Sequence, residues 1–203
     1  ITVRKRFAKV NKNNLVNTNN PDGVSKIKLN LFDDDISYIA IKDRLNKRSS
    51  DSYTWFGHIE GNENDQIIIV SHKGIVVGNM IIDLKMYQIR YVDGENYIIR
   101  EIDQSGFPEE EPYDLMEAEI NNIKNNIRNL QNISIVQNLN NTLNDGDPII
   151  DVLVVYTHEA ANAAGSQAAM EAEITLGVEE TNQSYENSEI NQRIELTGFE
   201  MIQ

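Results

Sequence analysis

A His-Glu pair opens the helical part of the segment VVYTHEAANAAG, and its spacing resembles that of zinc-binding helices. In the pattern H-E-x-x-H-x-x-G-x-x-H, imidazoles four residues apart reach one Zn²⁺, and the glutamate between them acts as a base toward bound water. The segment matches at His158, Glu159 and Gly165 and departs at Asn162 and Ala168. An amide is a weak zinc ligand beside imidazole and alanine is none, so this set of ligands is incomplete.

The place of this pair in the chain favours a structural role. His158 directly follows an apolar run, and Thr157 is a suitable N-cap for a helix that starts there. Glu159 would then lie in the first turn, where the helix dipole favours a carboxylate. Gly165 would mark a bend or a close approach of the helix to a sheet. We therefore interpret His158 as structural and predict no metal ligand in this chain.

The other ionisable clusters also have simpler structural explanations. The run Glu109–Glu111 lacks the alternating oxygen ligands and the glycine of a calcium loop, so we predict a solvated linker. Asp33–Asp35 is expected to be a turn between strands, with a metal site as the weaker alternative. His58 is interpreted as a strand residue near the core rather than as a catalytic base. No serine stands in a nucleophile elbow, and no glycine-rich phosphate loop follows a strand.

The composition excludes several classes of function. The 203 residues include 18 Lys and Arg against 32 Asp and Glu, and the formal charge of -14 repels nucleic acid and anionic membranes. There is no cysteine, which excludes disulfides, Cys-ligated zinc and thiol nucleophiles. No apolar run approaches the roughly 18 residues of a membrane span. We expect no nucleic-acid and no membrane partner. Because the chain starts at Ile1 and stops inside an apparent strand, we expect a piece of a longer precursor.

Two hydrophobic periods divide the chain. Residues 25–103 alternate with period two between turn residues, which predicts an antiparallel meander. In its clearest hairpin, YQIRYVDGENYIIR, Asp93 and Gly94 are expected to supply the positive φ of the turn. Beyond a Pro- and Glu-rich stretch, the period becomes helical; the stripe consists of Leu115, Ile120, Ile123, Ile127 and Leu130. We predict a β-rich region at 1–112, a helix and exposed connector at 113–148, and a third unit at 149–203.

The third unit has the pattern strand, long helix, strand. IIDVLVVYT is a nearly continuous apolar run, typical of a strand that is covered on both faces. One long helix, whose small residues allow close packing on a sheet, is predicted from Glu159 to about Asn187; its apolar stripe consists of Met170, Ile174, Val178, Thr181 and Tyr185. The order predicts an α+β fold class, in which an antiparallel β-rich region and a connector helix precede the start of an α/β unit.

Residues 149–200 resemble the opening of the catalytic domain of reprolysin-like metzincin zinc metallopeptidases, most closely the bacterial group that includes the peptidyl-Asp metalloendopeptidases. The features that carry this resemblance are the strand DVLVVYT, the Ala-rich start of the helix, ETNQSYENS and the strand after it. The preceding region, with YTWFGHIEG and YIIREIDQSGFPEE, is similar to the β-rich pro-regions of such enzymes. The resemblance implies a secreted zinc endopeptidase made as a zymogen, which hydrolyses peptide bonds with a metal-activated water.

The resemblance also implies where the catalytic residues lie. The zinc helix and its ligands are expected downstream of Gln203, so we assign no catalytic residue here and expect this chain alone to be inactive. Zinc would belong to the parent enzyme, whose partners would be its protein or peptide substrates and the pro-region that inhibits its catalytic domain. Without cysteine, any direct block of the zinc must use another ligand. A carboxylate from the 101–114 stretch is the candidate; the acidic residues there include Asp103, Glu109, Glu110, Glu111 and Asp114. Activation cleavage is predicted in the connector, at Asn144, Asp145, Gly146 and Asp147.

The alternative is a non-enzymatic, β-rich surface or binding module fused to an incomplete α/β unit. The β-rich region alone fits this alternative, because many binding domains share its strand pattern and a fold does not dictate a function. An H-E-x-x-H helix in the sequence that follows would establish the enzyme.

Overall fold

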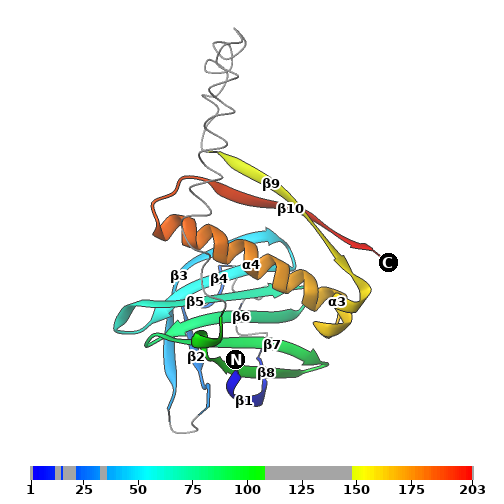
Figure 1. Ribbon diagram of the computed structural model, residues 1–203. Coiled ribbons are helices and arrows are strands. Elements are labelled where there is room, and N and C mark those ends of the chain that lie inside the picture. The colour runs from blue at the N-terminus through cyan, green and yellow to red at the C-terminus, as the bar shows by residue number, and fades with distance from the viewer. Residues whose placement is uncertain (1, 12–14, 16–21, 33–35, 108–147, 203) are drawn as a thin grey trace.

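One curled antiparallel sheet dominates the chain (Figure 1). The computed structural model describes residues 2–11, 15, 22–32, 36–107 and 148–202. Within these ranges, eight strands follow the order β1-β8-β7-β6-β5-β4-β3-β2. Their bounds are Thr2–Lys9 (β1), Lys26–Leu29 (β2), Tyr38–Ser49 (β3), Ser52–Ile59 (β4), Asn62–His72 (β5), Ile75–Ile82 (β6), Lys85–Asp93 (β7) and Asn96–Ile102 (β8), and a 3-10 turn, η2 (Gln104–Gly106), follows.

The C-terminal segment adds a two-stranded sheet and two α-helices. β9 (Ile149–Thr157) leads into α3 (His158–Ala163) and α4 (Gln167–Asn187), and β10 (Arg193–Ile202) returns to pair with β9 in parallel. α4 contacts β5 and β6 of the large sheet and also contacts β10. The helix therefore lies between the two sheets, as Figure 1 shows.

The central strands of the large sheet are buried on both faces. Trp55 and Ile67 belong to the core that fills the inside of the curl. Their sequence neighbours Phe56 and Ile68 point to the opposite face and belong to a second cluster, which includes Leu176 of α4. Because successive side chains of a strand alternate between faces, cover on both sides explains why the apolar run of β5 is unbroken.

Short turns connect the strands from β3 to β8, which gives the predicted meander. At the β7–β8 turn, Gly94 has a φ of 48°, whereas Asp93 remains in β7 without a positive φ. The expected hairpin is confirmed, but only the glycine supplies the positive φ. At the β5–β6 turn, Lys73 and Gly74 have φ values of 47° and 77°. Two successive positive φ values are typical of a type I′ turn, whose twist matches that of the flanking strands.

The junction between β9 and the helices follows the local predictions in part. The Thr157 side chain accepts a hydrogen bond from the Ala160 backbone N (3.3 Å), so the predicted N-cap is confirmed. Gly165 has a φ of 94°, and a Cβ added there would lie 2.7 Å from the Val92 carbonyl oxygen. Both the bend and the close approach to the sheet are therefore present. The prediction of one continuous helix is wrong, because Ser166 caps a new helix after this bend.

The expected α+β fold class is wrong for this chain. The described residues are predominantly antiparallel β-strand, with two α-helices that both lie between His158 and Asn187. The reason is the packing of α4, whose small apolar side chains cover the outer face of β5 and β6 and so complete the β-rich core. The predicted connector helix lies outside the described residues, and the predicted domain boundaries remain predictions. No helix in the described ranges is both long and apolar enough to cross a membrane.

Two expectations about burial in the C-terminal segment are also wrong. β9 is not covered on both faces, since Leu153 and Val155 are 55% and 49% exposed. On α4, the apolar side chains that are buried are Ala169, Ala172 and Leu176, and Glu171 and Thr175 are buried beside them. The predicted stripe is only half-buried; it consists of Met170, Ile174, Val178, Thr181 and Tyr185. The sheet selects the stripe with small residues because these allow the helix axis to approach it closely.

Candidate functional site

The residues with zinc-like spacing lie apart from the other histidines. His158 and Asn162 are exposed on α3. His58 Nδ1 lies 2.7 Å from Asp43 Oδ1 on the neighbouring strand, and His72 is buried at the end of β5. Among the residues that the structure describes, no group of three or more His, Cys, Asp or Glu side chains is placed to hold a metal ion. These residues therefore do not fit a zinc site.

Asp103 is the only predicted inhibitory carboxylate within the described ranges. It is exposed, and its Oδ1 accepts hydrogen bonds from the Ser105 backbone N (3.0 Å) and Oγ (2.6 Å). These bonds lower the pKa of Asp103. In this structure the carboxylate caps η2. The other candidates lie outside the described residues; they are Glu109, Glu110, Glu111 and Asp114, together with the cleavage positions Asn144, Asp145, Gly146 and Asp147.

A buried carboxylate on α4 gathers partners from both sheets. Glu171 is 3% exposed, and its Oε2 lies 2.9 Å from His72 Nε2 and accepts a hydrogen bond from Lys73 Nζ at 2.7 Å. Its Oε1 accepts hydrogen bonds from the Tyr156 hydroxyl (3.2 Å) and from Gln167 Nε2 (3.0 Å). These five residues, with Ser52 hydrogen-bonded to His72 Nδ1 (2.9 Å), are called the Glu171 cluster below.

The Glu171 cluster stabilises the charged form of its carboxyl group. Burial alone would raise the pKa of Glu171, but hydrogen bonds from Lys73, His72 and Gln167 and the positive charge of Lys73 outweigh it and lower the pKa to about 2. The hydrogen bond to Glu171 raises the pKa of Lys73 in turn. Burial, and then the Glu171 charge, raise the pKa of Tyr156. The cluster is therefore a charged connection, built around a buried carboxylate, between the β5–β6 turn and the C-terminal segment.

The hydrogen bonds run from Ser52 to His72 and on to Glu171, which is the order of serine, histidine base and orienting acid in a serine hydrolase. In that arrangement a hydrolase needs a serine that substrate can reach. Ser52 and His72 are cross-strand partners on β4 and β5, and they are 1% and 5% exposed. Substrate cannot reach a hydroxyl that is covered in this way. The geometry supports a structural connection and not nucleophilic catalysis.

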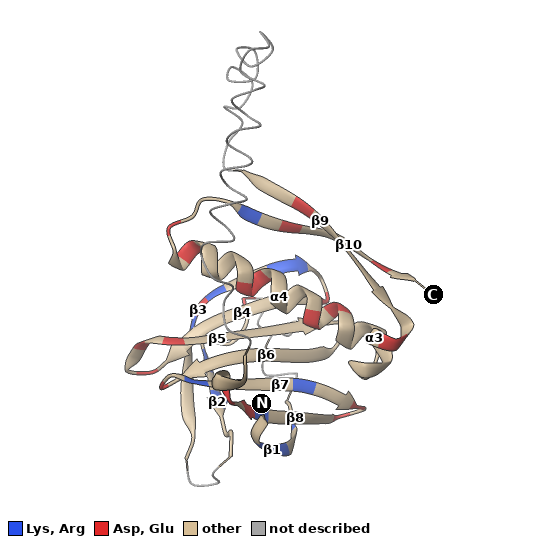
Figure 2. Cartoon of the chain, in the orientation of Figure 1, with Lys and Arg blue, Asp and Glu red and all other residues tan. Residues whose placement is uncertain are grey.

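Polar contacts continue along α4 beyond the Glu171 cluster. Arg90 of β7 lies 3.7 Å from Glu173 and donates to Asn79 Oδ1 at 2.8 Å, while Asn79 Nδ2 donates to Glu180 Oε1 at 2.6 Å. Burial raises the pKa of Glu180 despite the opposing effects of Asn79 and Arg90. Figure 2 shows acidic positions along α4. Further contacts to β3 and β4 are Arg44–Gln183, Arg44–Glu186, Asn46–Glu179 and Thr54–Glu179.

The surface between α4 and the large sheet is thus largely polar and complementary in charge. Its apolar part is small; the helix contributes Ala172 and Leu176 to a cluster with Phe56, Ile68, Val70 and Val77. Interfaces between units that can separate are typically more polar than the core of a single domain. The contact therefore combines a small buried apolar cluster with ion pairs and hydrogen bonds between α4 and the sheet.

Sequence reasoning did not single out any member of the Glu171 cluster. One signal was present, because Glu171 stands among the small residues Ala169 and Ala172 that form the buried stripe. A charged residue beside such a stripe requires a partner once the helix is buried. The partner Lys73 could not be inferred, since it lies 98 residues away in sequence.

Comparison with known proteins supplies distant relatives. The chain matches no protein-family model. It is 31% identical over 142 residues to a peptidyl-Asp metalloendopeptidase of Stenotrophomonas maltophilia strain R551-3, and 29% identical over 142 residues to a protein of that name from strain K279a. Each match covers 70% of this chain, which is more than residues 149–203 alone could supply. The matched segment spans 31% of the length of each relative, about a third.

Proposed function

We propose that this chain is the pro-region and the first part of the peptidase unit of a secreted zinc endopeptidase of the reprolysin-like metzincin group, made as a zymogen. The similarity to two proteins named peptidyl-Asp metalloendopeptidase supports the peptidase class. Since the matched segment is about a third of those proteins, the proposed zinc ligands lie in sequence beyond this segment. By analogy with the relatives' name, the proposed substrates are proteins or peptides cleaved next to aspartate.

The described residues have no direct role in zinc chemistry under this proposal. Zinc, when bound by the parent enzyme, would activate the attacking water. His158 is exposed, whereas His58 is bonded to Asp43 and His72 is bonded to Glu171. The chain on its own is therefore expected to cleave nothing. Its contribution is to hold the start of the peptidase unit.

The observation that carries the proposal is the Glu171 cluster. It joins the β5–β6 turn, which belongs to the β-rich region, to α4 and β9, which belong to the segment that resembles a catalytic domain. Removing the half-exposed Lys73 would leave the buried Glu171 carboxylate without its cation, which is unfavourable, so the folded β-rich region restrains α4. After cleavage of the connector, the polar contact can separate, and the restraint ends.

The test uses the complete gene product, with the sequence that follows Gln203 included. Supplied with zinc, it should be latent toward an Asp-containing peptide and become active when the connector is cut. Lys73→Met should weaken latency, because it removes the partner of Glu171, whereas Lys85→Met on the exposed start of β7 should not. A complete gene product that is fully active before cleavage contradicts the zymogen proposal. One that lacks an H-E-x-x-H helix and any peptidase activity contradicts the enzyme class.

A further inference from the structure

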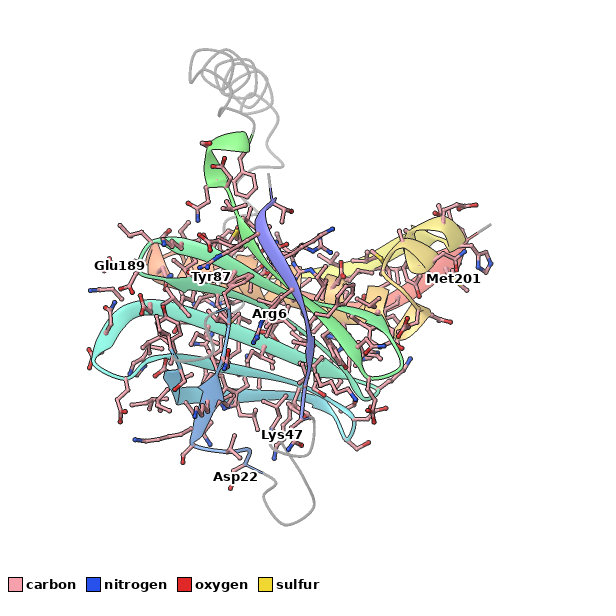
Figure 3. All side chains as sticks on the ribbon, turned by 90° about the horizontal axis from the view of Figure 1, so that it is seen from below. Arg6, Asp22, Lys47, Tyr87, Glu189 and Met201 are labelled. Carbon is pink, nitrogen blue, oxygen red and sulfur yellow. The ribbon has the colours of Figure 1, made fainter. Side chains whose placement is uncertain are left out.

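The inside of the curled sheet contains a cavity of about 610 Å³. The curl brings the two outermost strands, β1 and β2, toward each other. The Arg6 guanidinium of β1 bridges the gap by donating to the Asn30 carbonyl oxygen and to Asn30 Oδ1 (3.0 Å), directly after β2. Figure 3 shows Arg6 extending from β1 across the open side of the sheet. A closed or strongly curled sheet of eight strands is just wide enough inside to hold one small ligand.

The walls of this cavity are apolar and belong to the interior core. They include Leu29, Leu31, Ile69, Val76, Ile89 and Ile99, all of which are buried. Native cores pack at high density, with few voids larger than a water molecule. The volume falls within the range of about 300 to 1,000 Å³ that is typical of small-molecule sites. An apolar ligand would gain the packing contacts that this space lacks.

The ionisable residues around the cavity all carry positive charge. They are Arg6, Lys9, Lys26 and Lys28, and no Asp or Glu is among the described lining residues. This is unexpected in a chain with a formal charge of -14. Lys9 and Lys26 have carboxylate partners in Glu95 (3.7 Å) and Glu60 (2.6 Å).

Arg6 differs from Lys9 and Lys26 in its bonding. Its described acceptors are the neutral oxygens of Asn30 alone, and its Nε is buried without an acceptor in the described part of the chain. Buried polar groups are nearly always hydrogen-bonded, so an unused donor at a cavity needs an explanation. A guanidinium binds a carboxylate through two parallel hydrogen bonds, which the unused Nε–H would allow.

We propose that this cavity binds an amphipathic carboxylate of the fatty-acid class. The acyl chain lies along the apolar walls inside the curl, and the carboxylate accepts hydrogen bonds from Arg6 at the opening between β1 and β2. This site lies on the opposite face of the sheet from α4 and does not depend on the proposed peptidase role.

The binding test uses the sole tryptophan of the 203-residue chain as a reporter. Trp55 Nε1 donates to the Val24 carbonyl oxygen at 3.0 Å, and Val24 lines the cavity. Titration with dodecanoate, kept below its micelle concentration, should change the Trp55 fluorescence and saturate at one ligand per chain. Methyl dodecanoate should bind at least about tenfold more weakly, since it lacks the charge that Arg6 would pair. Absence of a saturable change with dodecanoate overturns the proposal.

Three variants test the assigned position of the head group and the acyl chain. Arg6→Met should weaken the binding of dodecanoate at least about tenfold and leave the binding of the methyl ester unchanged. The control is Lys5→Met, which removes the same charge from the exposed neighbour on β1. Ala8→Phe, at the wall, should weaken both ligands because its ring occupies the cavity. Equal dodecanoate affinities for Arg6→Met and Lys5→Met overturn the head-group assignment. If Arg6→Met does not fold, equal affinities of the unaltered chain for acid and ester overturn it.

Discussion

Replacing Glu171 with glutamine should destabilise the contact between α4 and the large sheet far more than the same replacement at Glu180. Both residues lie on α4 and face the sheet, and both substitutions remove one negative charge while keeping an amide of similar shape. At position 171 the substitution leaves the partially exposed Lys73 ammonium and the buried His72 without their carboxylate. At position 180 the remaining amide oxygen still accepts from Asn79.

The expected magnitude follows from the pKa of Glu171. A folded-state pKa of about 2, against the ordinary value of 4.5, corresponds to about 3 kcal/mol of stabilisation by the charged form. Because the folded pKa is depressed, this stability is fully present above pH 4.5 and is lost as the pH falls toward 2. For Glu180 the contribution of the charged form to stability has the opposite sign, because its pKa is raised and the folded state therefore disfavours the charged carboxylate. Neutralising Glu180 at pH 7 should therefore be neutral or stabilising.

Urea unfolding of the 203-residue chain, followed by circular dichroism and Trp55 fluorescence, measures both variants at pH 7. We expect Glu171→Gln to lower the free energy of unfolding by about 3 kcal/mol. The difference in unfolding free energy between Glu171→Gln and the unaltered chain should shrink at pH 3, because the unaltered chain has then begun to lose the stabilisation by the Glu171 carboxylate. Equal losses for Glu171→Gln and Glu180→Gln, or a loss of less than about 0.5 kcal/mol for Glu171→Gln, would refute the assignment of the Glu171 cluster as the main polar connection.

Three further outcomes test the fold and the proposed activation. Gly165→Ala should destabilise the chain by about 1 to 3 kcal/mol in thermal unfolding, because the φ of 94° at this position is strained for alanine. Gly177 lies in α4 with open space around it, so Gly177→Ala should stabilise the chain by about 0.5 to 1 kcal/mol. Gly57→Ala should prevent native packing of the Trp55 ring, which lies 2.4 Å from the added Cβ, and the emission of Trp55 should shift to that of an exposed indole. The proposed zymogen should yield a mature N-terminus within residues 145–149 by mass spectrometry, and a start elsewhere would exclude cleavage at that place.

Features that depend on neighbouring residues were predictable from the sequence. Period-two alternation predicts the meander because a strand turns successive side chains to opposite faces. Gly94 identifies the β7–β8 hairpin, and Thr157 identifies the start of α3, since turn and cap chemistry acts over a few residues. The resemblance at 149–200 likewise pointed to the class of relatives that the comparisons found.

Features that depend on which surfaces meet were not predictable in this way. Helical periodicity identified α4, but two stripes were available, and the sheet buries the one with Ala169 and Ala172 because small side chains permit close approach. The fold class was wrong for the same reason: α4 completes the outer face of β5 and β6.

The sequence by itself therefore predicted the meander, the Gly94 turn, a helical segment after β9 and the distant relationship to metallopeptidases. Only the tertiary structure decided that His72, Lys73 and Glu171 meet, and that Arg6 faces a cavity inside the curl. The physical reason is the range of the interactions. Turn and cap preferences act between residues that are adjacent in the chain, whereas a buried ion pair or a cavity wall forms only after distant segments pack together.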